Sequence, residues 1–236
     1  MNNCPVKYCS NKTFNNVLIK NVLKEIHMCI DKTKKIDRKT WTYNVAIERK
    51  NVTHHTWNDK SINENWPRIK LFDVFDKNGV EQTEIMMDGT DFNLDEYIYK
   101  PKPLLNLCPN IINIINSILD KDINNSKIWN AEISMVKGLG KIPRHCDSNY
   151  RPYCKDNYKY VRLHIPIQTT KYATFYIDYP NGKKMISHTL KKGILYKLNV
   201  NHYHHGVKNR SPQLRIHLII DVHSDAIKNL TWESYK

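Results

Sequence analysis

The sequence predicts a mainly β fold, in which a sandwich or barrel of short strands covers residues 126–236 and helices from the first half pack on its outside. The first observation is a series of short segments, rich in β-branched and aromatic residues and separated by turns, that recurs from residue 128 onward. These segments are Ile128–Val136, Val161–Ile167, Ala173–Tyr179, Ile194–Leu198 and Leu214–Val222. The second observation is the pair Asn181-Gly182, which is typical of a tight β-hairpin turn.

The first half of the chain has a different pattern. Apolar residues recur at helical spacing over Thr13–Ile30, with Thr13 as the expected N-cap. A second helix is expected over Pro109–Leu119, because proline is well tolerated in the first turn of a helix. Trp41–Ile47 alternates apolar and polar residues, and Ile69–Phe75 also looks extended, so both are expected to be strands.

The length and composition indicate one globular domain. The chain has 236 residues, of which 40% are hydrophobic and 25% charged, so it can bury one sizeable core. We expect residues 1–125 to form a support region that shapes the substrate pocket and residues 126–236 to form the catalytic core. No secretory signal or membrane-length apolar stretch is seen, so we expect a cytoplasmic protein with free thiols and no membrane partner.

The formal charge of +14 favours an acidic partner or a solvated basic surface. The basic residues are spread along the chain, with short clusters at Lys32–Arg38 and Lys183–Lys192. No aromatic RNA-recognition motif accompanies them. A nucleic-acid partner is therefore possible but not favoured, and the charge mildly favours a carboxylate-bearing substrate.

A metal site is predicted at His145-Cys146-Asp147. Residues i and i+2 of a strand project from the same face, so both side chains can reach one ion. A third ligand has to come from another segment, and His205 lies much later in the chain, with His202 and His204 close by. Two histidines and one carboxylate leave open coordination positions, which is typical of non-haem Fe(II) oxygenases.

An anion site is predicted at Arg215, which follows His205 after a short interval. This arginine opens an apolar strand, and a buried guanidinium needs an anion to offset its burial. A dicarboxylate that chelates the iron through one end could present its other carboxylate there, where an arginine can bind it in bidentate geometry. The alternative is a salt bridge at a sheet edge.

Several ordered motifs resemble the aspartyl/asparaginyl β-hydroxylase family. They are Ile133–Gly138, Lys141–His145, Val161–Ile167, His205–Asn209 and Arg215–Asp221. The resemblance covers roughly Glu132 to His223. It implies a double-stranded β-helix and a 2-oxoglutarate-dependent dioxygenase that uses Fe(II), 2-oxoglutarate and O2 to hydroxylate an amino-acid, peptide or protein substrate, with release of succinate and CO2.

The resemblance also implies roles for individual residues. The iron ligands are His145, Asp147 and His205, and the alignment selects His205 among the clustered histidines. Ser134 and Arg215 bind the distal carboxylate of 2-oxoglutarate, while Arg162 and His164 hold its metal-chelating end. The best-known animal members lack the carboxylate ligand that Asp147 supplies here. The other histidines are expected at the surface or in packing.

The segment between His145 and Arg162 is longer than in the animal pattern. It can cover the active site or contact substrate, and it contains the candidate substrate contacts Tyr150, Arg151 and Tyr153. Three other classes stay open: a non-catalytic cupin-type metal protein, a nucleic-acid-binding protein or nucleic-acid-associated oxygenase, and a zinc hydrolase. The zinc hydrolase lacks an identifiable general base.

Overall fold

The computed structural model describes residues 4–36, 68–75, 78, 81–82, 98–123, 128–145, 160–178, 185–200 and 203–235. The expected strand at Trp41–Ile47 and the turn at Asn181-Gly182 lie outside these residues. No helix in the described ranges is long and apolar enough to cross a bilayer.

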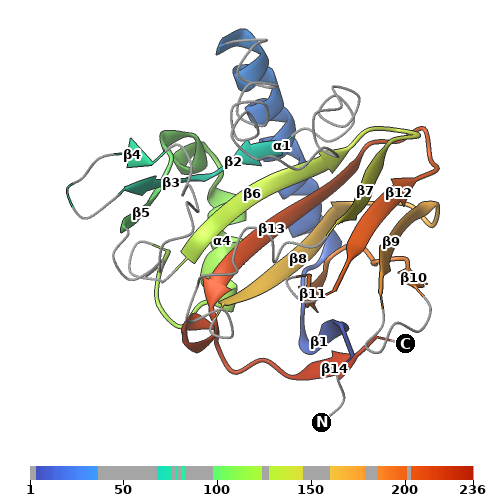
Figure 1. The fold of residues 1–236 in the computed structure, drawn as a ribbon. Coiled ribbons are helices and arrows are strands. Elements are labelled where there is room, and N and C mark those ends of the chain that lie inside the picture. Colours follow the sequence, from blue (N-terminus) through green and yellow to red (C-terminus); the bar gives the residue numbers. More distant parts are fainter. Residues whose placement is uncertain are drawn as a thin grey trace.

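Eight strands that follow one another in the described residues, β6 to β13, form the centre of the fold and are divided between two antiparallel sheets (Figure 1). Successive strands change sheet except at β9 and β10, which pair with each other. The larger sheet contains, in spatial order, β11 (Ile194–Leu198), β8 (Tyr160–Gln168), β13 (Arg215–His223) and β6 (Ile128–Val136). The smaller sheet contains β10 (Ile186–His188), β9 (Ala173–Ile177), β12 (His205–Asn209) and β7 (Lys141–His145). This order of eight strands is a jelly roll, and it confirms the predicted fold class.

Further strands extend the larger sheet on both sides, and two of them, β1 and β2, come from outside the predicted core. β1 (Val6–Thr13) pairs with β11, β14 (Trp232–Ser234) pairs with β1, and β2 (Arg68–Lys70) pairs with β6. A separate three-stranded sheet consists of β3 (Phe72–Phe75), β4 (Glu81–Gln82) and β5 (Ile98–Pro101). The extended conformation expected for Ile69–Phe75 is therefore confirmed.

Among the described residues, two α-helices cover the outer face of the larger sheet (Figure 1). They are α1 (Asn16–Ile36) and α4 (Pro109–Ile118). The short 3-10 helix η2 (Pro103–Leu107) directly precedes α4, and a second one, η4 (Ser224–Ala226), follows β13. The second predicted helix is thus confirmed. The predicted start of the first is wrong, because Thr13 still belongs to β1 and the Asn15 side chain accepts a hydrogen bond from the Leu18 N–H (2.9 Å).

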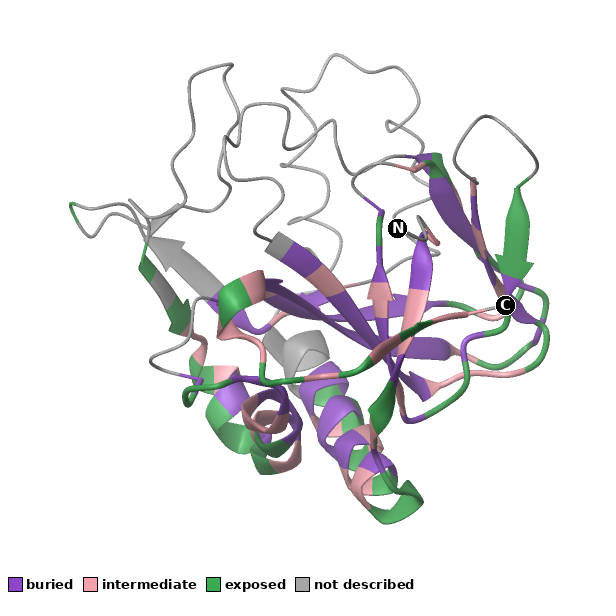
Figure 2. Ribbon diagram, turned by 90° about the horizontal axis from the view of Figure 1, so that it is seen from below, coloured by how far each residue is buried: buried purple, intermediate pink, exposed green. Residues whose placement is uncertain are grey.

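Alternation along the strands divides the core into two layers. On β13, Ile216, Leu218 and Ile220 face the helices and belong to the larger apolar cluster. A second cluster, which includes Tyr196 and Phe175, fills the space between the two sheets. Figure 2 shows buried residues along the strands and on one side of α1. The alternate residues of β13, starting with Arg215, face the interior between the sheets, where polar side chains gather.

Candidate functional site

Two histidines meet across neighbouring strands of the smaller sheet. His145 ends β7, His205 begins β12, and the two are direct partners in the antiparallel register. Their ring centroids lie 4.2 Å apart, and their exposed fractions are only 8% and 7%. Two segments that are distant in the sequence therefore bring their imidazoles to one buried place.

The backbone orients both imidazole rings in the same way. His145 Nδ1 lies 2.8 Å from the carbonyl oxygen of Pro143, and His205 Nδ1 lies 3.3 Å from that of Tyr203. A carbonyl oxygen can only accept, so in the neutral imidazole each Nδ1 carries the proton and each Nε2 keeps a lone pair. Histidine ligands of metals are commonly oriented by such a bond from the other ring nitrogen.

The third predicted ligand is not among the described residues. Asp147 lies outside them, as do Tyr150, Arg151, Tyr153 and His202. Within the described ranges no group of three metal-binding side chains is found. His204 is half-exposed and its Nδ1 lies 3.9 Å from an oxygen of Asp178, so it points away from His145.

A cluster of buried cationic and imidazole groups lies on the larger sheet. Arg215, the first residue of β13, is 4% exposed and donates from a terminal guanidinium nitrogen to His217 Nδ1 (3.1 Å). The His217 ring packs edge-on against that of His164, with centroids 5.8 Å apart. Burial lowers the pKa of Arg215, and burial together with the Arg215 charge holds the pKa of His217 well below its usual range.

This cluster has buried hydrogen-bond donors that an anion could satisfy. Since His217 Nδ1 accepts from Arg215, its Nε2 carries a proton, yet this atom has no acceptor among the described residues. Neither ring nitrogen of His164 has a described partner, although the residue is only 7% exposed. No described carboxylate contacts Arg215. Buried donors without acceptors are costly, and a carboxylate with several acceptor oxygens fits them.

Ser134 belongs to the same place in the fold. It lies on β6 with an exposed fraction of 1%, and its Cα partner across the ladder is His217. The first-half strand β2 borders it, because Arg68 is its partner on the other side. The Arg68 guanidinium lies 3.6 Å from the carboxylate of Glu132, which is also buried.

Arg162 is held in a buried ion pair. Its Nε and one terminal nitrogen each donate to a different oxygen of Asp221, both at 2.7 Å. The two residues are direct partners on β8 and β13. Arg162 and His164 lie on the same face of β8, and the charge of Arg162 helps lower the pKa of His164, after burial itself. Asp221 therefore fixes the guanidinium beside the histidine cluster.

The structure thus assembles Ser134, His164, Arg162 and Arg215 on the larger sheet and His145 and His205 on the smaller one. Two further residues contact this assembly, His217 beside Arg215 and Asp221 beside Arg162, and neither received a role from the sequence. Both lie in the strand that Arg215 opens, at even spacing from it. Period-two alternation from Arg215 was the available signal, because it places residues 217 and 221 on the arginine's face of the strand.

Comparison with known proteins identifies one family. The model of the Aspartyl/Asparaginyl beta-hydroxylase family matches residues 56–225, which is most of the chain. A search of curated proteins finds no match.

Several solved structures resemble the fold at low sequence identity. A prolyl-4-hydroxylase from Pseudomonas putida is 12% identical, with a TM-score of 0.42, over 94% of this chain and 93% of its own. An oxidoreductase of the 2OG-Fe(II) oxygenase family from Burkholderia pseudomallei is also 12% identical, with a TM-score of 0.42, over 70% of this chain and 71% of its own. AviO1 from Streptomyces viridochromogenes is 11% identical, with a TM-score of 0.49, over 97% of this chain and 94% of its own.

Proposed function

Because the chain belongs to the aspartyl/asparaginyl β-hydroxylase family and is a 2-oxoglutarate-dependent hydroxylase, we propose that it hydroxylates an aspartyl, asparaginyl or other amino-acid C–H bond. The substrate is a peptide, a protein or a free amino acid. The reaction consumes 2-oxoglutarate and O2 and gives succinate, CO2 and the hydroxylated product. One oxygen atom enters the product and the other enters succinate.

The observation that carries the proposal is the pairing of two complementary half-sites inside the jelly roll. On one sheet, His145 and His205 present two Nε2 lone pairs from rings 4.2 Å apart. On the other sheet, Arg215 and His217 present buried donors without a described carboxylate. A dicarboxylate would chelate a metal ion held by the histidines with one end and accept hydrogen bonds from Arg215 and His217 with the other.

His145, His205 and Asp147 would hold the iron, which when bound supplies the position where O2 and the 2-oxo acid react. Arg215, Ser134 and the Nε2–H of His217 would bind the distal carboxylate of 2-oxoglutarate by charge-assisted hydrogen bonds. Arg162 and His164 would lie toward its chelating end, with Asp221 keeping the Arg162 guanidinium in place. The interior position of these groups would keep water away from them.

We also propose that residues 1–125 help shape the substrate pocket within one domain. This rests on β2, which borders Ser134, and on the contact between Arg68 and Glu132. Residues Tyr150, Arg151 and Tyr153 stay candidate substrate contacts by their place in the sequence alone.

The test is succinate release from 2-oxoglutarate with Fe(II) and a panel of free amino acids and peptides, followed by mass spectrometry for one added oxygen. His145→Ala and His205→Ala should abolish turnover, and Arg215→Ala should mainly raise the KM for 2-oxoglutarate. His204→Ala is the matched control, since this exposed neighbour should be dispensable. Full turnover in either His145→Ala or His205→Ala would disprove the metal site, and a wild-type chain that binds metal but no 2-oxoglutarate would favour a cupin-type binding protein.

A further inference from the structure

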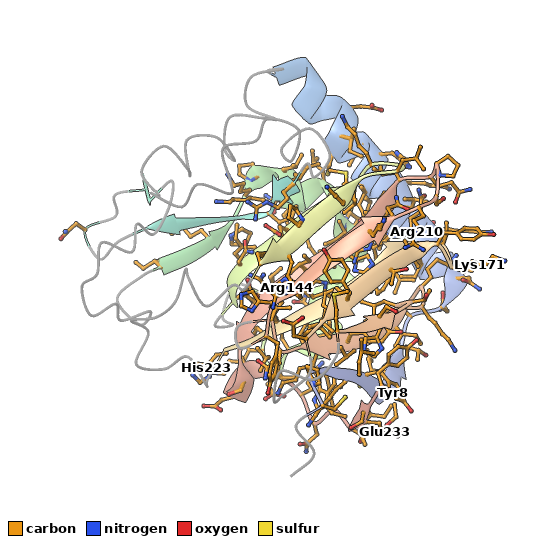
Figure 3. All side chains as sticks on the ribbon, turned by 45° about the vertical axis from the view of Figure 1, so that its right-hand side comes forward. Tyr8, Arg144, Lys171, Arg210, His223 and Glu233 are labelled. Carbon is orange, nitrogen blue, oxygen red and sulfur yellow. The ribbon has the colours of Figure 1, made fainter. Side chains whose placement is uncertain are left out.

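Three turns lie side by side at the end of the jelly roll that is remote from the two histidines. They are residues 137–141, 169–172 and 208–214, and we call them the basic turn cluster. The Leu139 N–H donates to the Ser211 carbonyl and the Arg210 N–H to the Tyr172 carbonyl, both at 3.0 Å. Figure 3 shows Lys171 and Arg210 together at this end, away from Arg144. Lys141 begins β7 and His145 ends it, so the Cα atoms of these two residues lie about 13 Å apart along an extended strand.

The basic turn cluster has charge of only one sign. It contains five exposed cations and, over its three segments, no aspartate or glutamate. These cations are Lys137, Lys141, Lys171, Lys208 and Arg210. Lys141 and Lys208 are direct partners in the antiparallel register, where two like charges destabilise the ladder. An anionic partner would relieve this repulsion.

Two large side chains project into solvent from the same turns. Leu139 is 77% exposed and Tyr172 is 55% exposed. The backbone of Leu139 is left-handed, with φ of 61°. This conformation is energetically unfavourable for an L-residue with a large side chain. The preceding residue, Gly138, packs so closely against the Pro212 backbone that a Cβ there would overlap it. This close packing holds the turn in place. The fold therefore holds an aliphatic side chain outward at a local cost.

We propose that the basic turn cluster docks the protein on an anionic lipid surface. The five cations contact the acidic headgroups, while Leu139 enters the apolar boundary and Tyr172 lies at the headgroup level, where its polar and apolar parts are both satisfied. A nucleic acid would neutralise the same charges but would offer Leu139 no aliphatic phase, so the observations favour a bilayer. Peripheral binding of this kind needs no membrane-spanning helix and does not depend on the proposed hydroxylase activity.

The test uses the full chain in co-sedimentation with vesicles of phosphatidylcholine alone or with added phosphatidylserine. Binding is expected only with phosphatidylserine and should weaken as salt rises. Lys141→Gln/Lys208→Gln should lower vesicle affinity about 30-fold, from the typical contribution of a lysine near an anionic membrane. Lys100→Gln/Lys121→Gln removes the same charge from exposed lysines outside the cluster and should bind like the wild type.

Leu139→Asn separates the apolar contribution from charge. Asparagine tolerates the left-handed conformation, so this variant should fold at least as well as the wild type, yet it should bind vesicles more weakly. The proposal is overturned if the wild type ignores phosphatidylserine or if the cluster and control double variants bind equally. It is also overturned if duplex DNA or a polyglutamate peptide binds more tightly than the vesicles and loses its affinity in the cluster variant.

Discussion

Removing either member of the Arg162–Asp221 ion pair is expected to destabilise the fold by about 3 kcal/mol. The pair is bidentate, with both nitrogen–oxygen distances 2.7 Å, and the Asp221 side chain is 1% exposed. Asp221→Asn leaves a guanidinium that is only 18% exposed without its counter-charge. Arg162→Met leaves a carboxylate that almost no water can reach. In each case, the remaining charge loses its bidentate partner of opposite sign.

A double-mutant cycle isolates this interaction. The double variant Arg162→Met/Asp221→Asn leaves no charge behind, so it should lose less free energy than the two single variants together, with a coupling energy of about 2–3 kcal/mol. Urea denaturation followed by circular dichroism gives the four free energies of unfolding. Arg144 and Asp178 form the matched control, because their side chains are 53% and 26% exposed and such pairs typically couple by less than about 1 kcal/mol.

A coupling energy below about 0.5 kcal/mol for the buried pair would refute this account of its energetics. The 2-oxoglutarate dependence of turnover tests the functional part separately. If Asp221 fixes Arg162 for the cosubstrate, Asp221→Asn should raise the KM for 2-oxoglutarate. A loss of stability with an unchanged KM would leave Arg162 as a structural residue and remove it from the proposed site.

Three further predictions address other parts of the fold. Glu25 on α1 accepts the N–H groups of Asn110 (2.8 Å) and Ile111 (3.0 Å) at the start of α4, so Glu25→Gln should cost about 1–3 kcal/mol by removing a charge-assisted cap; an unchanged urea midpoint would contradict this. Gly206 follows the predicted ligand His205, and a Cβ there would overlap the Tyr176 hydroxyl and come within 2.7 Å of the Ile142 carbonyl oxygen. Gly206→Ala should therefore destabilise the fold by about 1–3 kcal/mol and weaken metal binding in a titration, whereas unaltered metal affinity would mean that β12 adapts without moving the histidine. Burial lowers the pKa of both His164 and His217 below 6.5, so the unfolded chain binds more protons than the folded one at acidic pH. The free energy of unfolding is therefore unaffected by protonation of the two histidines above about pH 6.5, and below it their protonation lowers this free energy by up to about 2.7 kcal/mol per pH unit. The variant His164→Gln/His217→Gln should lose stability less steeply than the wild type between pH 7 and about 5.5, and an equal slope for the two proteins would refute this prediction.

Much of the fold was predictable because its signals are local. Strands β6, β8, β9, β11 and β13 carry β-branched and aromatic residues, and their periodicity does not depend on distant partners. Strands β7, β10 and β12 were missed as elements, since their mixed polarity gives little pattern. β1 was missed because its partner β11 lies near the other end of the chain, and no local window contains that tertiary contact.

The same distinction separates the parts of the candidate site. His145 and Arg215 were found through short motifs with a recognisable spacing. Asp221 was not, because its meaning depends on the register that sets it opposite Arg162. His217 was interpreted as an ordinary packed or surface residue, and only its contact with Arg215 and the missing acceptor for its Nε2–H indicate a ligand.

The short spacing between His205 and Arg215 has a structural cause in the turn that joins β12 to β13. This turn carries the chain from the smaller sheet to the larger one, and the buried Asn209 side chain ties it down. Asn209 Nδ2 donates to the carbonyl oxygens of Val136 (3.2 Å) and Gln213 (2.7 Å), and its Oδ1 accepts from the Ser211 N–H (3.1 Å). Because Val136 ends β6, the same amide also joins this turn to the β6–β7 turn, which leads to His145. These buried hydrogen bonds therefore fix the turn through which the chain passes from one sheet to the other. The number of residues between His205 and Arg215 is the number needed to complete β12, make this turn and begin β13.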